Sequence, residues 1–170
     1  VENAWLGRSL LHVLAERSNV KLFCPAKVTG IKVVADGVLV NAEQNQATTQ
    51  FHAKLLVVAD GAASDSCRYL GIDHDIHSYG HTALIANVST AQAHKGIAYE
   101  RFTKSGPIAL LPQQATNNSP HRSALIWTLP EDEAKQLQAL DDKAFLAELQ
   151  QRFGSWQGEF TRIGARHSYP

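Results

Sequence analysis

The first apolar pattern in the chain predicts a helix. Four leucines recur at the spacing of one helical face, whereas Arg8, His12 and Glu16 fall on other faces. The leucines are Leu6, Leu10, Leu11 and Leu14. This pattern predicts an amphipathic helix from about Asn3 to Arg17.

The segments that follow predict strands separated by turns. A short strand is expected at residues 20–23, and two longer strands at 26–35 and 38–42 are expected to be joined by a hairpin turn at Asp36-Gly37. Polar residues at 43–46 turn the chain into another strand at 48–52. The run Leu55–Val58 has no alternation, which is typical of a central strand buried on both faces.

The second half of the chain predicts a mostly antiparallel sheet with two helices. Strands are expected at residues 83–88, 97–103, 108–111, 123–129 and 159–168, with Gly, Pro, Asn and Ser between them. Helical patterns cover 131–137 and 143–153, and Asp141 is the expected N-cap of the second helix. With a boundary at residues 71–80, the fold class is mixed α/β (α+β), in two regions, 1–72 and 73–170.

Composition narrows the class of protein. The 170 residues are 44% apolar and 19% charged, and 16 basic residues balance 16 acidic ones, so the charge provides no field for nucleic acid. Two isolated cysteines favour a reducing compartment, the cytoplasm, and the apolar runs are shorter than the ~20 residues that span a bilayer. The chain begins at Val1, has no leader and contains no Met, which indicates a piece of a longer protein.

Candidate chemistry follows the Leu55–Val58 run. Asp60 and Gly61 come directly after it, and the glycine permits close approach of the backbone to a ligand. Ser64 is placed to cap a short helix whose N–H groups would face outward. This arrangement suits a carboxylate that reaches sugar or phosphate groups of a ligand. A strand-to-helix turn without a ligand explains the same residues equally well.

Further segments then occur in a fixed order. They are Val1-Glu2-Asn3, Leu84-Ile85-Ala86-Asn87-Val88, Tyr99-Glu100-Arg101-Phe102-Thr103, Gly106-Pro107-Ile108-Ala109-Leu110-Leu111-Pro112, Gly164-Ala165-Arg166 and Tyr169-Pro170. With the segment at residues 55–64, this set resembles the flavoprotein monooxygenases related to para-hydroxybenzoate hydroxylase. It is most similar to their ubiquinone-biosynthesis branch, and its spacing is most similar to the bacterial 2-octaprenyl-6-methoxyphenol hydroxylases. The resemblance covers essentially the whole chain.

The resemblance implies an internal piece of an FAD- and NAD(P)H-dependent monooxygenase that hydroxylates a polyprenylated phenol with molecular oxygen. Region 1–72 would be part of an FAD-binding Rossmann-like lobe with a small β-hairpin sheet, and region 73–170 a substrate-binding lobe. The cofactor supplies the difficult chemistry, so no residue is expected to be a catalytic group. The parent is expected in the cytoplasm, at the inner membrane or with other ubiquinone-biosynthesis proteins. The exposed edge of Leu55–Val58 makes a homodimer a further expectation.

The resemblance also assigns residues to ligands. The cofactor-binding candidates are Asp60, Gly61, Ser64, Arg68 and Asn3. The substrate-binding candidates are Arg101, Phe102, Leu111 and Pro112. For Asn3 an N-cap role is an equal alternative, and the Arg101 to Pro112 set fits ordinary sheet residues equally well. Where the family pattern has Arg, this chain has Cys67, and Arg68 stands about 100° further around a helix.

Other readings of the chain stay open beside this one. A non-catalytic docking or scaffold module is the first, and a related flavoprotein epoxidase or reductase is the second. The histidines at positions 74, 77 and 81 match no closed metal site, so no metal is expected.

The chain contains no Gly-x-Gly-x-x-Gly segment and no second Gly-Asp flavin motif. We therefore expect the isolated 170-residue chain to bind free FAD weakly or not at all. Titrating FAD while following quenching of flavin fluorescence measures this, and tight stoichiometric binding would contradict it.

Overall fold

The chain is organised as two compact units. The computed structural model describes residues 2–116 and 119–169. The N-terminal unit comprises Asn3–Ile76, and the C-terminal unit comprises the described residues of 77–170 together with Glu2.

The N-terminal unit begins with the expected helix, α1 (Asn3–Ala15). Its leucine-rich face is not covered, because α1 contains no buried residue, and Trp5, Leu10 and Leu11 are exposed. The sequence therefore specifies this helix through its periodicity, while its apolar face contributes nothing to the core of the described structure.

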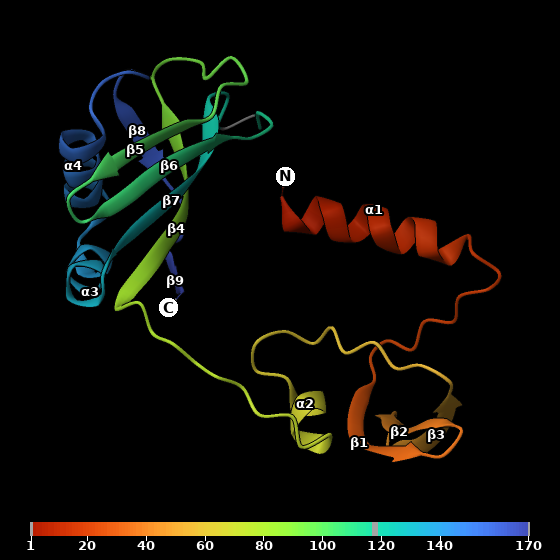
Figure 1. The fold of residues 1–170 in the computed structure, drawn as a ribbon. Coiled ribbons are helices and arrows are strands. Elements are labelled where there is room, and N and C mark those ends of the chain that lie inside the picture. The colour runs from red at the N-terminus through yellow and green to blue at the C-terminus, as the bar shows by residue number, and fades with distance from the viewer. Residues whose placement is uncertain (1, 117–118, 170) are drawn as a thin grey trace. The chain divides into compact units, whose positions relative to one another are not determined.

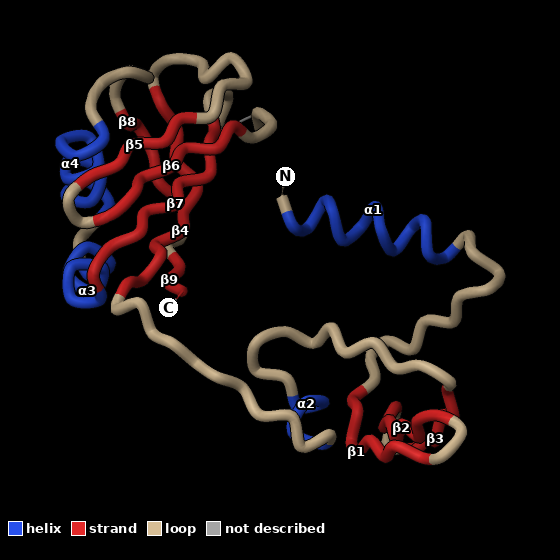
Figure 2. The backbone as a smooth tube through the Cα atoms, in the orientation of Figure 1, coloured by secondary structure: helices blue, strands red, loops and turns tan. Residues whose placement is uncertain are grey.

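A three-stranded antiparallel sheet follows, in the order β1-β2-β3 (Figures 1 and 2). Its strands are β1 (Lys27–Val34), β2 (Gly37–Gln44) and β3 (Ala47–Ala53). The first hairpin is confirmed, although Ala35 and Asp36 form its turn and Gly37 opens β2. A Cβ on Gly37 would lie 2.3 Å from the Ala53 carbonyl oxygen, so glycine is required by close approach of the neighbouring strand.

Two expected strands of this unit do not form. Residues 20–23 and 55–58 lie outside any strand, and the side chains of Leu55 and Val57 are 78% and 76% exposed. The prediction of a buried central strand at Leu55–Val58 is therefore wrong for this structure. β-branched residues favour extended backbone, but a strand also needs a neighbour for its N–H and C=O groups. None of the described strands pairs with this run.

The C-terminal unit contains a larger antiparallel sheet in the order β5-β6-β7-β4-β8, and β9 also pairs with β4. Its strands are β4 (His81–Thr90), β5 (Tyr99–Thr103), β6 (Gly106–Pro112), β7 (Arg122–Pro130), β8 (Phe160–Ile163) and β9 (His167–Tyr169). The expected antiparallel sheet is confirmed. The single strand expected at 159–168 is divided, with β8 ending at Ile163 and β9 beginning at His167.

Two helices cover one face of this sheet, α3 (Glu131–Ala139) and α4 (Asp142–Phe153) (Figure 1). Side chains in β7 alternate strictly between buried and half-buried positions, so every second residue packs under the helices. Trp127 of β7 contacts Phe145 of α4 edge to face, with ring centroids 5.6 Å apart. The Asp141 carboxylate accepts from the Ala144 N–H at 2.7 Å, which confirms the expected N-cap.

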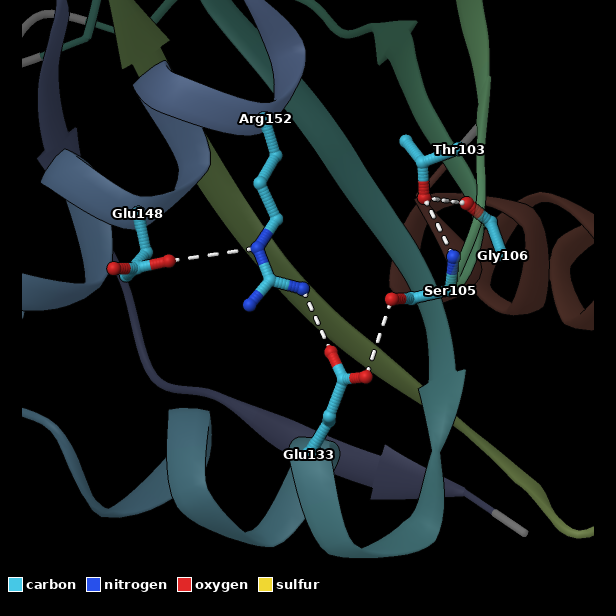
Figure 3. Close-up of polar contacts among 6 residues, drawn as sticks. All are labelled: Thr103, Ser105, Gly106, Glu133, Glu148 and Arg152. Atoms are coloured by element: carbon cyan, nitrogen blue, oxygen red, sulfur yellow. Dashed lines mark hydrogen bonds and ion pairs between the residues drawn. The ribbon is translucent and has the colours of Figure 1, made fainter.

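A polar network joins the two helices to the turn between β5 and β6 (Figure 3). The Arg152 guanidinium of α4 donates to the Glu133 carboxylate of α3 at 2.8 Å and lies 3.4 Å from Glu148. The Ser105 hydroxyl donates to the other oxygen of Glu133 at 3.1 Å. The Arg152 hydrogen bond, helped by the one from Ser105, lowers the pKa of Glu133 below its ordinary value. Glu133 therefore stays ionised and connects three elements.

No helix in the described part of the chain combines the length and apolarity needed to cross a bilayer.

Replacing Phe145 by Ala is expected to destabilise the C-terminal unit strongly. Phe145 is fully buried against Trp127, and large-to-small changes of this kind cost about 3 to 5 kcal/mol. The matched control is Phe102→Ala, because Phe102 is 79% exposed on the same unit and should change the free energy of unfolding by less than about 0.5 kcal/mol. Chemical denaturation of both variants measures the difference, and equal losses would contradict this packing.

Candidate functional site

The Asp60 turn of the N-terminal unit is held by a short chain of hydrogen bonds. The Ser64 hydroxyl donates to one Asp60 carboxylate oxygen at 2.5 Å, and the Ser66 N–H donates to the other at 3.2 Å. Ser64 also caps α2 (Asp65–Tyr69), because its hydroxyl oxygen accepts from the Cys67 N–H at 3.0 Å. The capping role expected for Ser64 is confirmed.

These hydrogen bonds affect the ionisation of Asp60 and determine which polar groups of the turn remain available to a ligand. The hydrogen bond from Ser64, followed by those from Ser66, lowers the pKa of Asp60, so its exposed carboxylate stays ionised. Each carboxylate oxygen keeps a lone pair for a further donor. The N–H groups of Ser66 and Cys67, which were expected to face a ligand, are instead bonded to Asp60 and Ser64. The turn therefore offers a carboxylate acceptor to a ligand.

Gly61 gives a ligand room beside this carboxylate. Its φ of +84° is a conformation that residues with a Cβ rarely adopt, and a Cβ added there would meet no atom within 4 Å. Packing against the described residues therefore does not require glycine at this position. The backbone conformation requires glycine there, and the open space around its Cα is available to a bound group.

The other two cofactor candidates are placed less directly. The Arg68 guanidinium pairs with the Asp65 carboxylate at 2.7 Å and lies 5.5 Å from the centre of the Tyr69 ring. Asn3 is the first residue of α1 and is exposed. The structure therefore joins Asp60, Gly61 and Ser64 in one turn, and gives Arg68 a partner within its own helix.

The substrate candidates divide between the two faces of the large sheet. Arg101 pairs with the buried Ile108 in register, and its guanidinium donates to the Phe153 carbonyl of α4 at 2.6 Å. Arg101 thus lies on the helix-covered side. Phe102, the next residue, lies on the helix-free side, because successive side chains of a strand point to opposite faces. One wall of a single site cannot contain both side chains.

Leu111 and Pro112 divide in the same way. Leu111 pairs with Ala124 and lies on the helix-free face, whereas Pro112 pairs with the buried Ser123 on the helix-covered face. The structure therefore brings Phe102 and Leu111 to the helix-free face and separates them from Arg101 and Pro112.

The helix-free face has a polar end and an apolar remainder. The polar end contains a pocket of about 280 Å³, which is lined by Asn87, Ser89, Thr116, Ser119, Arg122, Arg162 and Gly164. Arg122, Ser89 and Arg162 stand side by side in the register of β7, β4 and β8. The hydroxyls of Ser89 and Ser119 are hydrogen bonded at 2.9 Å. The pocket therefore combines guanidinium, hydroxyl and amide groups.

Next to this pocket the same face becomes apolar. Ala109, Ile126 and Ile85 form a register row across β6, β7 and β4, and they are partly exposed. Leu111 and Ala124 lie between this row and the polar pocket. The face therefore suits a ligand that has a polar head and an apolar extension.

Glu2 is linked to the polar end through Arg122. Its carboxylate forms an ion pair with the Arg122 guanidinium, and the two side chains are 30% and 17% exposed. Sequence reasoning missed Glu2, Arg122 and Ser89 as site residues. A signal was present, because Asn87 interrupts the apolar run at residues 83–88 and Ser89 follows it two positions later, on the same face of a strand. Arg122 directly precedes the expected strand at 123–129.

Comparison with known proteins gives a consistent set of relatives. No model of a known protein family matches the chain. The chain is 35% identical over 169 residues to ubiquinone hydroxylase UbiL of Rhodospirillum rubrum and 33% identical over 157 residues to the mitochondrial ubiquinone biosynthesis monooxygenase COQ6 of Caenorhabditis elegans. It is 25% identical over 170 residues to ubiquinone hydroxylase UbiM of Neisseria meningitidis. The expected resemblance is confirmed.

These matches cover 99%, 88% and 100% of the chain, but 38%, 32% and 35% of the respective relatives. The chain therefore spans about a third of the length of the curated relatives it matches.

Solved structures share the fold. The anhydrotetracycline hydroxylase OxyS from Streptomyces rimosus matches with a TM-score of 0.55 and 20% identity, over 96% of this chain and 30% of that chain. The flavin-dependent halogenase CmlS matches with a TM-score of 0.59 and 13% identity, over 84% of this chain and 26% of that chain. The expected α/β fold class is confirmed.

The Asp60 carboxyl is expected to titrate below the range of an ordinary aspartate, and Ser64→Ala should move its pKa back towards that range. Because the folded pKa is lowered, the stability that ionised Asp60 contributes is complete above the ordinary aspartate pKa and is lost as the pH falls through the lowered value. Carbon NMR of the carboxyl group measures both values. An Asp60 pKa that is the same in Ser64→Ala and in the unaltered chain would contradict the geometry.

Proposed function

Because the chain is a homologue of the ubiquinone hydroxylases over almost its whole length, we propose that it forms part of an FAD- and NAD(P)H-dependent monooxygenase that hydroxylates a polyprenylated phenol with molecular oxygen. The observation that carries this proposal is the 35% identity to ubiquinone hydroxylase UbiL across 99% of the chain.

In this proposal the two regions of the chain bind different ligands. Residues 1–72 form part of the FAD-binding lobe, and residues 73–170 form the substrate-binding lobe. FAD, when bound, would supply the activated oxygen, with electrons from NAD(P)H. The chain's own residues bind, orient and exclude water, so no side chain has to break or form the difficult bonds.

The Asp60 turn fits one polar part of FAD. Its ionised carboxylate accepts hydrogen bonds, which suits a sugar hydroxyl, and the open space at Gly61 admits a ligand close to the backbone. Ser64 acts by holding the carboxylate in place. Arg68 and Asn3 are proposed as outer contacts, with Arg68 oriented by its pair with Asp65.

The helix-free face of the large sheet suits the phenol. Its polar pocket accommodates a hydroxylated ring, and the adjoining apolar row accommodates the start of a prenyl tail. Phe102 and Leu111 extend this apolar surface, so they remain the substrate-binding candidates from the sequence. Arg101 and Pro112 support the site from the opposite side, Arg101 through its bond to the Phe153 carbonyl.

The chemistry of the substrate also suggests where the enzyme works. A polyprenylated phenol partitions into lipid, so we place the enzyme in the cytoplasm at the inner membrane surface, or in an assembly with other ubiquinone-biosynthesis proteins. Residues 55–58 form no strand in this structure, and the side chains of Leu55 and Val57 are exposed. Pairing between two copies of the chain would use this segment.

The full-length protein that contains this chain provides the test of function. With FAD, NAD(P)H, oxygen and a short-tailed 2-prenylphenol, we expect a product heavier by one oxygen atom on the ring. Mass spectrometry and NMR of the product separate this outcome from epoxidation or reduction of the tail. No consumption of NAD(P)H and no product would favour the docking module and overturn the proposal.

Asp60→Ala should weaken FAD binding by about ten- to a hundredfold, since hydrogen bonds to charged groups contribute about 1.5 to 3 kcal/mol. Asp36→Ala removes an exposed carboxylate from the same unit and should leave FAD binding unchanged. Flavin fluorescence titration of the two variants of the full-length apoprotein measures the difference, and equal affinities would remove Asp60 from the cofactor site.

A further inference from the structure

Two guanidinium groups, those of Arg122 and Arg162, line the polar pocket on the helix-free face, and one of them is paired with a carboxylate. A guanidinium only donates hydrogen bonds and an ionised carboxylate only accepts them. Arg122 lines the pocket, and Glu2 is ion-paired with Arg122. The pocket-lining residues that the structure describes include no carboxylate, so Glu2 supplies the only anionic acceptor among these groups.

Limited solvent access strengthens this pair. The Glu2 and Arg122 side chains are 30% and 17% exposed, so solvent screens them less than a surface pair. The hydroxyls of Ser89 and Ser119 are hydrogen bonded to each other, so part of the hydrogen-bonding capacity of each is already used. A ligand oxygen beside this pair can therefore accept from the Arg122 guanidinium, and a ligand hydroxyl there can donate to Glu2, the one carboxylate among these groups.

A phenolic hydroxyl is the ligand group that uses both partners. Its O–H donates and its oxygen accepts, so one group can bond to Glu2 and to Arg122 at once. The pocket volume of about 280 Å³ exceeds the roughly 150 Å³ of a cavity that binds benzene. One substituted ring therefore fits, and a long tail must leave the pocket across Ala124 towards the Ile85 and Ile126 row.

We propose that Glu2 and Arg122 hold the phenolic hydroxyl of the ring, with Glu2 accepting its hydrogen bond and Arg122 donating to its oxygen. This inference rests on the proposed function and adds to it two binding residues and a substrate requirement, a free phenolic O–H. Accepting that hydrogen bond increases the electron density of the ring, which favours reaction with an electrophilic oxygen donor. Glu2 thereby orients the ring and favours the reaction.

A comparison of two ligands in several variants tests this inference. The ligands are a short-tailed 2-prenylphenol and its methyl ether, which differ in the O–H donor. Their affinities for the oxidised, FAD-loaded full-length protein are measured by isothermal titration calorimetry. We expect the unaltered protein to bind the phenol about tenfold or more tighter than the ether, as a hydrogen bond to a charged group implies.

In Glu2→Ala this preference should fall to about one, and in Glu2→Gln, which keeps a neutral acceptor, it should be intermediate. The matched control is Glu131→Ala, which removes a carboxylate from the Glu131–Lys135 pair on α3 and should keep the full preference. Because the ratio is taken within each variant, a change in stability that weakens both ligands alike does not affect it. Arg122→Lys should weaken both ligands, because the oxygen of each accepts from Arg122.

Two results would overturn the inference. The first is a phenol preference that is unchanged in Glu2→Ala. The second is tighter binding of benzoate by Glu2→Ala than by the unaltered protein with no phenol preference in either, because Glu2 would then only block an anion site on Arg122. Hydroxylation of the phenol with an unchanged preference in Glu2→Ala defeats this inference alone. A Glu2-dependent preference without any hydroxylation defeats the proposed function alone.

Discussion

Burial of Trp127 beneath α4 is the interaction on which the C-terminal unit depends. It fixes which alternate residues of β7 face the helices, and the antiparallel register extends that choice to β4 and β6. The same register leaves the opposite residues in rows on the helix-free face. A hydrophobic contact on one side of the sheet therefore determines the chemistry that is presented on the other side.

The polar network of Glu133 and Arg152 complements this core without being part of it. It connects α3, α4 and the turn after β5 at the edge of the sheet. Arg101 adds a second attachment by bonding to the carbonyl at the end of α4. Arg101 of β5 thus faces the helix layer, whereas Glu100 and Phe102 are directed to the helix-free side.

The N-terminal unit combines an ordered polar turn with exposed apolar side chains. Its polar turn at Asp60 is closely organised by side-chain and backbone donors, while many large apolar side chains of α1 and of the Leu55–Val58 run are exposed. Exposed apolar surface of this extent marks regions that pack against other protein segments or partners. The N-terminal unit thus presents an ordered carboxylate at Asp60, and the helix-free sheet face of the other unit presents a polar pocket beside an apolar row.

Periodicity in the sequence by itself determined α1, α3, α4 and most strands of the large sheet, because their apolar spacing matches the geometry of the element they form. Local chemistry determined the caps at Ser64 and Asp141. The fate of Leu55–Val58 depended on tertiary structure, since strand propensity does not supply a neighbouring strand. Tertiary structure also decided that Arg101 and Phe102 face opposite ways, and it brought Glu2 to Arg122 across 120 residues of sequence. No local pattern encodes such a pairing, because it arises from register and packing.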